Sequence, residues 1–333
     1  MNAVKLEDIA NMLGISVSTV SRAISGNGRV GEKTRERVLK AVRESDYTVN
    51  AVARSLRLKD AKNIGIVVPD ITNSFFSALI KGAQQVCREN SYSLMVCNSD
   101  ENPEYEEEAL QLLLEKQISG LILASVGRTA DTLRQYERLS IPVVYIDNLP
   151  DASEARDMVS IDNFSAARRL TLAMIERGHR HVGMITGPLS QSTARLRYEG
   201  FCRALEVSGI EMRNEWVLEG DFHMESGYSK MKQLLKLPEV PDAMIFANNH
   251  LAYGALNAIR EAGLDVPGDI AIAAFDAIDH TKLITPLITC INQPVQEIGK
   301  QAAAAIFSRL SSDEELPPRE LILDSFLLEG DSW

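Results

Sequence analysis

From Asn63 onward, short β-rich apolar runs alternate with amphipathic helical segments, and this alternation is the feature that most constrains the fold. It is typical of parallel sheets with helices on both faces. The predicted strands are IGIVVP (64–69), SLMVCN (93–98), GLILAS (120–125), VVYID (143–147), VGMIT (182–186), AMIFA (243–247) and IAIAAF (270–275), with one more over 320–328. The predicted helices include 74–90, 104–117, 163–178, 194–208 and 249–262. We therefore expect an α/β protein with two doubly wound sheets, the chain first passing between them at 158–163.

Polar and aromatic side chains follow several of these strands. Ligands of doubly wound sheets bind beyond the carboxyl ends of the strands, so the crevice between two such lobes is the expected ligand site. The candidate ligand residues are Phe75, Asp147, Ser192, Arg197, Phe222, Asn248, Asp276 and Gln293. Carboxylates, amides and one Arg beside aromatic rings suit a polyol. Structural alternatives remain open, because Asp276 could cap a helix, Phe222 could be a core ring and Asn248 a loop amide.

The N-terminal 46 residues have a different pattern, that of three short helices. The first runs from about Leu6 to Leu13, and Gly14 can supply the turn after it. Ser16 is a plausible N-cap for a second helix that ends near Ile24. Residues 26–28 break the pattern, and a third helix starts near Glu32.

The first two of these helices have the register of a helix-turn-helix. Counted from Leu6, Ala10 is fifth, Gly14 ninth, Ile15 tenth and Val20 fifteenth, which supplies the small, turn and apolar residues that the motif requires. The second helix is then expected to expose a set that suits the major groove of DNA, namely Val17, Ser18, Ser21 and Arg22. An ordinary small helical bundle is the alternative.

The charge distribution agrees with a DNA-binding head. The whole chain has a net charge of -11. Residues 1–62 nevertheless contain 12 Lys and Arg and 7 Asp and Glu, which makes this part +5 and the remainder -16. A basic head on an acidic body places the expected polyanion-binding surface at the N-terminus.

The stretch VKLEDIANMLGISVSTVSRAISGNGRVGEKTRERVLKAV resembles the head of the lactose repressor (LacI/GalR) family, and YTVNAVARSLRLK is similar to that family's hinge. The resemblance covers nearly the whole chain. It implies that Val17, Ser18 and Arg22 read bases, and that Arg22 suits the O6 and N7 atoms of guanine. The same resemblance makes Thr19, Ser21 and Asn27 phosphate contacts, while Arg29 is either a DNA contact or a solvated loop charge.

The hinge pattern is matched by Asn50, Ala53, Leu56 and Arg57. The resemblance implies that two hinge helices, one from each subunit, pair in the minor groove. Leu56 would then wedge between base pairs and Arg57 would lie in the narrowed groove. Hinge folding on DNA has an entropic cost, which makes the hinge a plausible switch.

The resemblance also implies a core like that of periplasmic sugar-binding proteins, with Arg197 and Asp276 as the most regular effector contacts. Phe75, Asp147, Phe222, Asn248 and Gln293 match effector positions too. Two positions depart from the family pattern. Asn249 stands where an Asp is usual, which removes one expected carboxylate, and Ala274 stands where a Gly is usual. The predicted effector is a sugar or sugar derivative, with a purine or a sugar acid as the alternative.

Several other classes of function are not supported. The N-terminus has acids where an export signal would be apolar, and no apolar run approaches a membrane span, so we expect a cytoplasmic, nucleoid-associated protein without membrane contact. The four cysteines have no CxxC spacing, and GHRHVG has the wrong spacing for a metal site. Because no catalytic motif occurs, we predict no enzyme activity, cofactor or metal. A solute-binding or enzymatic protein with an incidental helical head is the alternative from another class.

The predicted organisation has four parts: a head at 1–48, a hinge helix and linker at 49–62, an N-lobe at 63–161 plus 293–321, and a C-lobe at 162–292 plus 322–333. A head of this size reads one half-site, so we expect a homodimer on a palindromic operator. By resemblance alone, 74–90 and 93–117 form the dimer interface. The predicted function is repression of a carbohydrate-utilisation operon, relieved when an inducer closes the crevice, although the ligand could also act as a corepressor.

Overall fold

The computed structural model describes residues 6–25, 30–44, 62–127, 130–149, 156–277, 285–312, 314 and 316–333. The chain divides into two compact units, Met1–Asp60 and Ala61–Trp333. The first is the helical head and the second is the α/β core.

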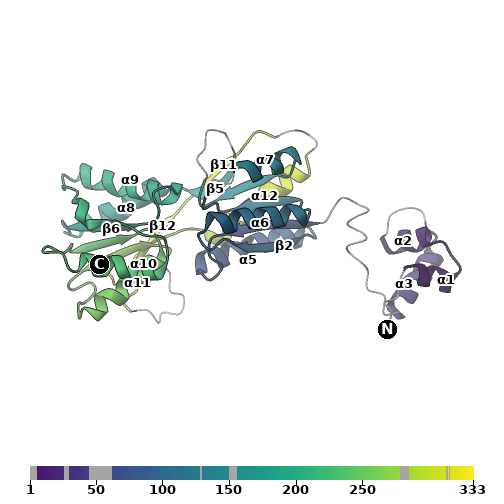
Figure 1. The fold of residues 1–333 in the computed structure, drawn as a ribbon, viewed down its shortest axis with the longest axis horizontal. Helices are drawn as coiled ribbons and strands as arrows, with labels where there is room; N and C mark the ends of the chain where they lie inside the picture. The colour runs from purple at the N-terminus through teal and green to yellow at the C-terminus, as the bar shows by residue number, and fades with distance from the viewer. Residues whose placement is uncertain are drawn as a thin grey trace. The chain divides into compact units, whose positions relative to one another are not determined.

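The head consists of α1 (Leu6–Leu13), α2 (Val17–Ser25) and α3 (Glu32–Glu44), as Figure 1 shows. The three helices bury one small apolar cluster: Ile9, Ala10, Val20, Ala23, Val38 and Ala41. Gly14 adopts a left-handed φ of 66° in the turn between α1 and α2, as the sequence predicts for this position. Ser16 caps α2, because its Oγ accepts a hydrogen bond of 3.2 Å from Thr19 N.

The N-lobe of the core is built on a parallel sheet of six described strands in the order β11-β5-β4-β3-β1-β2. Helices α5 and α12 pack together on one face, and α6 and α7 cover the other (Figure 1). The bounds are β1 Asn63–Val68, α5 Ser74–Glu89, β2 Ser93–Asn98, α6 Pro103–Glu115, β3 Gly120–Leu123, α7 Ala130–Arg138, β4 Val143–Ile146, β5 Asp157–Ile161, α12 Val295–Leu310 and β11 Glu320–Leu323.

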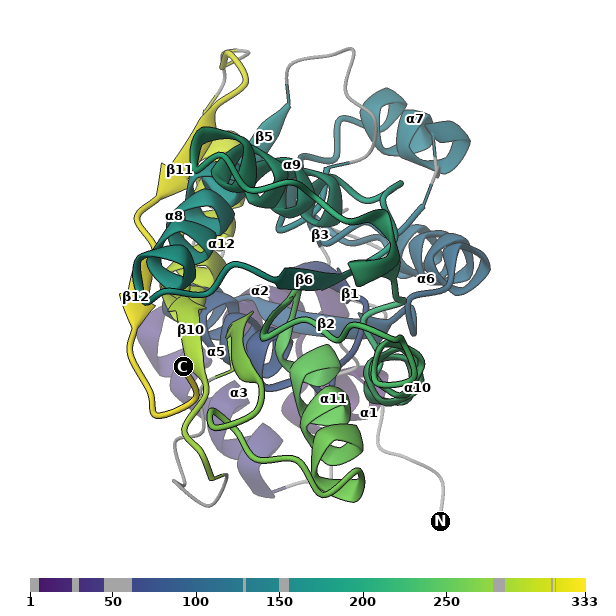
Figure 2. The same cartoon turned by 90° about the vertical axis from the view of Figure 1, so that its left-hand side faces the viewer.

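The C-lobe repeats this architecture with the described strands in the order β12-β10-β9-β8-β6-β7, of which only β12 is antiparallel. Figure 2 shows the pair α8 and α9 on the opposite side of β6 from α10 and α11. The bounds are α8 Asn163–Glu176, β6 Val182–Thr186, α9 Ser192–Val207, a 3-10 turn Asn214–Trp216, β7 Val217–Glu219, α10 Met224–Leu234, β8 Ala243–Phe246, α11 Asn249–Glu261, β9 Ala271–Phe275, β10 Thr289–Asn292 and β12 Phe326–Leu328.

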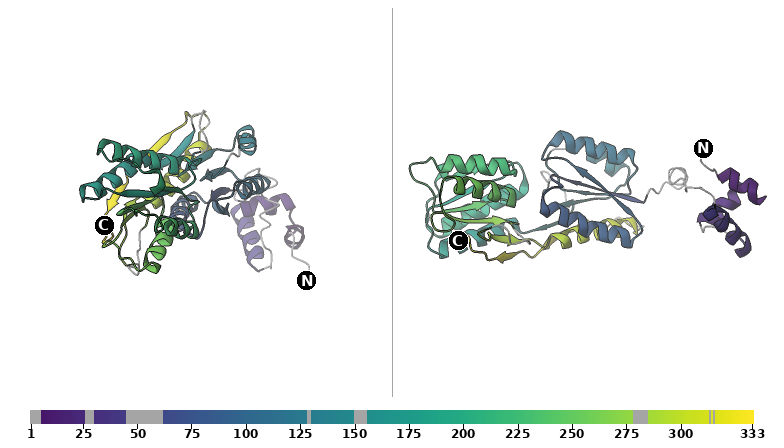
Figure 3. Two further views of the ribbon diagram at one scale, coloured as in Figure 1. Left: turned by 60° about the vertical axis from the view of Figure 1, so that its left-hand side comes forward. Right: turned by 90° about the horizontal axis from the view of Figure 1, so that it is seen from below.

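The chain crosses between the two lobes at three places. It passes from β5 to α8 at Asp162, from β10 to α12 at 293–294, and from β11 to β12 at 324–325. Figure 3 shows the two lobes side by side from two directions. The single strand predicted over 320–328 is wrong in this respect, because β11 belongs to the N-lobe sheet and β12 to the C-lobe sheet.

Close helix crossings tighten both lobes. A Cβ on Gly82 of α5 would lie 2.1 Å from Gln296 O of α12, and a Cβ on Gly254 of α11 would lie 1.9 Å from Met224 O of α10. Any side chain at these two positions would force the helix pairs apart. Among the described residues, none of the helices is both long enough and apolar enough to cross a membrane.

Candidate functional site

The second helix of the head presents the predicted base-reading side chains. Ser18 and Arg22 are exposed on α2. Val17 is partly buried and packs against the head cluster, so it is less exposed than its sequence position predicted. The Thr19 hydroxyl lies 2.8 Å from Ser16 Oγ, and Ser18 Oγ is also 2.8 Å from that atom. Ser21 belongs to the same helix and precedes Arg22 in the chain.

The remaining predicted DNA contacts lie outside the described residues, namely Asn27, Arg29, Asn50, Ala53, Leu56 and Arg57. The described part of the head therefore contains the recognition helix and its support. Arg37 of α3 contributes to that support, because its Nη2 donates a hydrogen bond of 3.5 Å to Leu13 O at the end of α1.

The core has a pocket between its two lobes, with about 530 Å³ of space that includes an opening to solvent. Six of the eight predicted effector residues line it: Phe75, Asp147, Arg197, Phe222, Asn248 and Asp276. The other lining residues are Pro69, Asp70, Asn73, Phe76, Glu101, Asn148, Gln191, Thr193, His223 and Asn249. Strand ends from both sheets supply most of these side chains, as the fold class predicts.

Four pocket residues just beyond strand ends have a left-handed backbone. The φ angles are 53° at Glu101 after β2, 58° at Asp147 after β4, 69° at Phe222 after β7 and 56° at Asp276 after β9. This conformation is unfavourable for residues other than Gly and is concentrated at binding and catalytic sites. Asp147, Phe222 and Asp276 were predicted as effector contacts, whereas Glu101 was not, and the strained backbone is an independent reason to place all four in a functional site.

Arg197 lies at the centre of the pocket and is held on several sides. Its Nε donates to Asn163 Oδ1 at 2.8 Å, and its Nη1 donates to Ala247 O at 2.5 Å. Its guanidinium carbon lies 4.1 Å from the centroid of the Phe275 ring. These contacts fix the plane of the guanidinium and leave Nη2 directed toward Asp147, 3.9 Å away.

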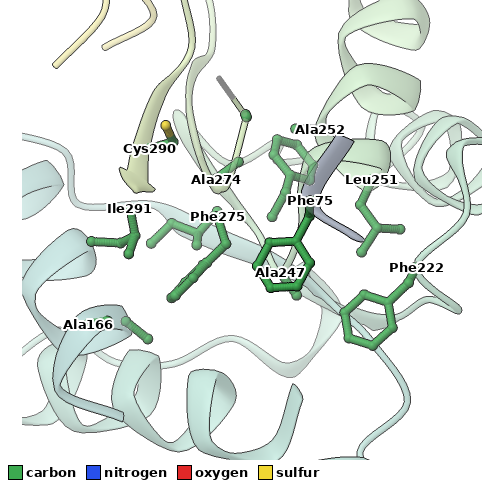
Figure 4. Packing of buried hydrophobic residues seen from close by; sticks show 14 of the residues in the cluster. Phe75, Ala166, Phe222, Ala247, Leu251, Ala252, Ala274, Phe275, Cys290 and Ile291 are labelled. Carbon is green, nitrogen blue, oxygen red and sulfur yellow. The ribbon is translucent and has the colours of Figure 1, made fainter. Parts of the chain in front are cut away.

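The apolar walls of the pocket come from both lobes. Phe75 of α5 and Phe222 belong to the same buried cluster as Phe275, and Figure 4 shows the three rings in this cluster. Phe222 packs over Gly187, where an added Cβ would lie 2.1 Å from the tip of its ring. The rings provide flat apolar faces beside the charged centre of the pocket.

The two remaining predicted residues, Ser192 and Gln293, do not line the pocket but hold residues that do. Gln293 Nε2 donates to Asp276 Oδ2 at 2.6 Å. Ser192 Oγ lies 3.2 Å from Asn148 Oδ1 and accepts a hydrogen bond of 2.9 Å from Leu149 N. In this arrangement both side chains orient residues of the pocket, and their predicted contacts with an effector stay a prediction.

The electrostatics of the pocket are dominated by carboxylates. Among the described lining residues, the acids are Asp70, Glu101, Asp147 and Asp276, and the one guanidinium is that of Arg197, which interacts with Asp147 and Asp276. Burial raises the pKa of Asp276 to about 6, although Arg197 and the Gln293 hydrogen bond oppose the shift. Burial also raises the pKa of Asp147, and the positive charge of Arg197 again opposes the shift. The described lining therefore contains four acidic side chains, although Asn249 removes one carboxylate that the family resemblance implied.

Glu101, Asn148 and Gln191 also line the pocket but were not predicted from the sequence. Gln191 Nε2 donates to Glu101 Oε2 at 3.0 Å, and Asn148 Nδ2 donates to Gln191 Oε1. Burial raises the pKa of Glu101 to about 7. No sequence pattern points to Glu101, which follows β2 by three residues, whereas Asn148 directly follows the predicted Asp147.

Two family models match the chain. Residues 5–50 match the bacterial regulatory proteins of the lacI family, and residues 61–329 match the periplasmic binding proteins and sugar binding domain of the LacI family. The chain belongs to the LacI family. A family model over most of the core, together with a second one over the head, confirms both the predicted resemblance and the predicted fold class. The chain is thus a DNA-binding transcriptional repressor of this family.

Individual LacI-family relatives agree with this assignment. The HTH-type transcriptional repressor PurR of Haemophilus influenzae (strain PittEE) is 35% identical over 311 residues, which cover 93% of this chain and 92% of PurR. The lac repressor dimer bound to operator and the anti-inducer ONPF superposes with a TM-score of 0.86 at 26% identity, covering 99% of both chains. The regulator CelR in complex with cellobiose has a TM-score of 0.74 at 27% identity, covering 99% of this chain and 100% of CelR.

Proposed function

We propose that this LacI-family repressor controls a carbohydrate-utilisation operon in the cytoplasm and responds to a neutral sugar or sugar derivative. The observation that carries the proposal is the pocket in which Arg197 faces the carboxylates of Asp147 and Asp276. Carboxylate oxygens accept hydrogen bonds from sugar hydroxyls, and a guanidinium donates to hydroxyl or ring oxygens. The phenylalanine rings supply the apolar faces that cover a sugar's C–H groups.

The excess of acids distinguishes a neutral sugar from a sugar acid. An anionic ligand would approach four acidic side chains and one guanidinium in the described lining. Glu101, whose pKa is raised to about 7, is only partly ionised at neutral pH, but the negative charge of the other acids makes an anion unfavourable in a desolvated pocket. A neutral polyol has hydroxyl donors for these carboxylates and brings no charge of its own. We therefore propose a neutral ligand in place of the sugar acid. The sugar-bound structure of CelR supports the same class of ligand.

A purine corepressor is the second candidate. It is favoured by the relatives named PurR and by the flat rings of Phe75, Phe76 and Phe222 in the pocket, on which a planar base could stack. Amide side chains of the lining, such as Asn248, could pair with the edge of a base. The two candidate ligands have opposite effects on operator affinity, because an inducer lowers that affinity and a corepressor raises it.

We propose the predicted DNA contacts on the same basis of family membership. Val17, Ser18 and Arg22 read bases, Thr19, Ser21 and Asn27 contact phosphates, and Arg29 is a further DNA contact. The hinge residues Asn50, Ala53, Leu56 and Arg57 bind the minor groove of a palindromic operator. Two copies of the chain form the dimer that binds the operator. Each copy has the four parts predicted from the sequence. In this proposal the protein needs no cofactor and catalyses no reaction.

Screening the full chain for thermal stabilisation tests the ligand class. Panels of neutral sugars, sugar acids and purines are added separately, and a neutral sugar at 100 times its Kd should stabilise the protein by about 2.7 kcal/mol. Arg197→Lys serves as the control for binding at this site, because a lysine keeps the positive charge but cannot make the hydrogen bonds that Arg197 donates to both Asn163 and Ala247. Stabilisation by purines alone would reject the sugar proposal in favour of the second candidate.

Operator binding then tests the sign of the response. The full chain selects its own operator from a pool of random duplexes, and its affinity is measured with and without the stabilising compound at one fixed salt concentration. A sugar that lowers this affinity acts as an inducer, as proposed. A sugar that raises it would overturn the induction part of the proposal.

A further inference from the structure

Two buried asparagines contact each other across the cleft between the lobes. Asn73 of the N-lobe donates through Nδ2 to Asn249 Oδ1 at 3.0 Å, and Asn249 of the C-lobe donates through Nδ2 to Asn73 Oδ1 at 2.9 Å. The two residues are only 5% and 1% exposed. They are 176 residues apart in the chain and belong to different lobes, since Asn73 caps α5 and Asn249 begins α11, so the pair joins the lobes directly.

Backbone donors fix the orientation of both amides. Asn73 caps α5, and its Oδ1 accepts a hydrogen bond of 3.0 Å from Phe75 N. Asn249 is the first residue of α11, and its Oδ1 accepts one of 2.9 Å from His250 N. A flipped amide would turn its NH₂ group toward a backbone N–H, which is unfavourable. Each Nδ2 group must therefore face the partner's oxygen, and both positions need an oxygen and an N–H donor on one side chain.

We propose that Asn73 and Asn249 form an inter-lobe latch that sets how readily the two lobes separate. Both amides are excluded from water while the lobes are together, so breaking one of the two bonds leaves a buried polar group without its partner. Because the paired groups are complementary in shape and hydrogen bonding, the latch specifies one relative position of the lobes at this edge of the cleft.

The latch is placed to influence the pocket. Asn73 lies two residues before Phe75, Asn249 directly follows Asn248, and both asparagines are themselves part of the pocket lining. A second set of contacts bridges the lobes elsewhere on the lining, where Gln191 of the C-lobe donates to Glu101 of the N-lobe at 3.0 Å. His250 Nδ1 also lies 3.6 Å from Asp70 Oδ2. Of these three contacts between the lobes, the pair of neutral asparagines is the one in which each side chain both donates a hydrogen bond to its partner and accepts one from it.

Weakening the latch should shift the population toward separated lobes and reduce the affinity of any ligand that needs both lobes. This consequence rests on the proposed function, because it assumes that the effector binds between the lobes. The latch itself does not depend on the identity of the effector.

Hydrogen exchange on the full chain without added effector tests the latch. The variants are Asn73→Asp and Asn249→Asp, which keep the oxygen that accepts from the backbone but replace the amide donor with a second oxygen. We expect the amides at the starts of α5 and α11 to exchange about ten- to a hundredfold faster in both variants, since exchange follows the population of the opened form.

Asn102→Asp is the matched control. Asn102 caps α6 in the N-lobe, and its Oδ1 accepts a hydrogen bond of 2.8 Å from Glu104 N within the same lobe. This control should leave exchange at α5 and α11 unchanged. Exchange at wild-type rates in both latch variants would overturn the proposal, and so would equal acceleration in the control.

The effector proposal can fail independently of the latch. If the latch variants exchange faster while no sugar stabilises the wild-type chain, the latch stands and the sugar assignment falls. If a sugar binds the wild type and the variants exchange at wild-type rates, the latch is rejected and the sugar assignment stands.

Discussion

Arg197 Nη2 lies 3.9 Å from Asp147 Oδ1, and these side chains are 4% and 14% exposed. The two groups come from different lobes, since Asp147 follows β4 of the N-lobe sheet and Arg197 belongs to α9 of the C-lobe. Hydrogen bonds to Asn163 and Ala247 hold the guanidinium on its own lobe. The pair therefore connects the charged centre of the pocket to the relative position of the lobes.

Arg197→Lys should weaken effector binding by at least about tenfold while the fold is retained. A lysine keeps the positive charge beside Asp147 and Asp276, but its single nitrogen cannot replace the planar set of donors. Calorimetric titration with the effector found in the screen measures the loss. Arg203→Lys on the same helix, where the exposed Arg203 pairs with Glu206, is the control and should bind normally.

Gly187→Ala should reduce effector affinity through Phe222. The added Cβ would lie 2.1 Å from the Phe222 ring tip, so the ring must rotate away from its place in the pocket wall. Overpacking of this kind costs about 1–3 kcal/mol of folding free energy, and we expect the displacement of the ring from the pocket wall to appear in addition as a loss of ligand affinity. Gly178→Ala is the control for a general effect of a Gly→Ala change. Because Gly178 has a φ of 104°, this variant should be less stable than the wild type, but its ligand affinity should be unchanged. Unchanged affinity in Gly187→Ala would contradict this role of Phe222.

Glu101→Gln should stabilise the protein above neutral pH. Because burial raises the folded-state pKa of Glu101 to about 7 from an ordinary value near 4.5, the protonated form is favoured in the folded protein. The stability that this preference contributes is present below pH 4.5 and is lost as the pH rises to 7. Chemical denaturation should show the variant about 1–2 kcal/mol more stable than the wild type at pH 8, and no such gain at pH 4. A gain of equal size at both pH values would contradict this explanation.

Arg22→Ala should weaken binding to the selected operator about 5- to 150-fold without unfolding the head. Arg22 is exposed on α2, and a lost bidentate contact to guanine costs about 1–3 kcal/mol. The measurement is operator affinity at fixed salt, with circular dichroism to confirm that the head is folded. Arg35→Ala, which removes an exposed positive charge from α3, is the control. Similar losses in both variants would point to a nonspecific effect of charge.

Local sequence patterns determined the head and the class of the core. The spacing of Ala10, Gly14 and Val20 predicted two helices that pack against each other on either side of one turn. In the structure Ala10 and Val20 are buried, and Gly14 lies in the turn with a left-handed φ. The strand–helix alternation predicted parallel sheets because each run of apolar residues is short and contiguous. Asp147 and Asp276 could be placed in the cleft because both follow strands, and strand ends in such sheets meet at one edge.

Only the tertiary structure decided which polar groups meet across the cleft. Asn249 was noted in the sequence as the loss of an expected carboxylate, yet its partner, Asn73, is 176 residues away. Glu101 and Gln191 meet in the same way, and Gln293 turns out to hold Asp276 instead of lining the pocket. Contacts of this kind depend on how the two sheets are positioned relative to each other by the chain crossings between the lobes. Periodicity reports which face of an element is buried, whereas the partner that faces it is set by packing over long sequence distances.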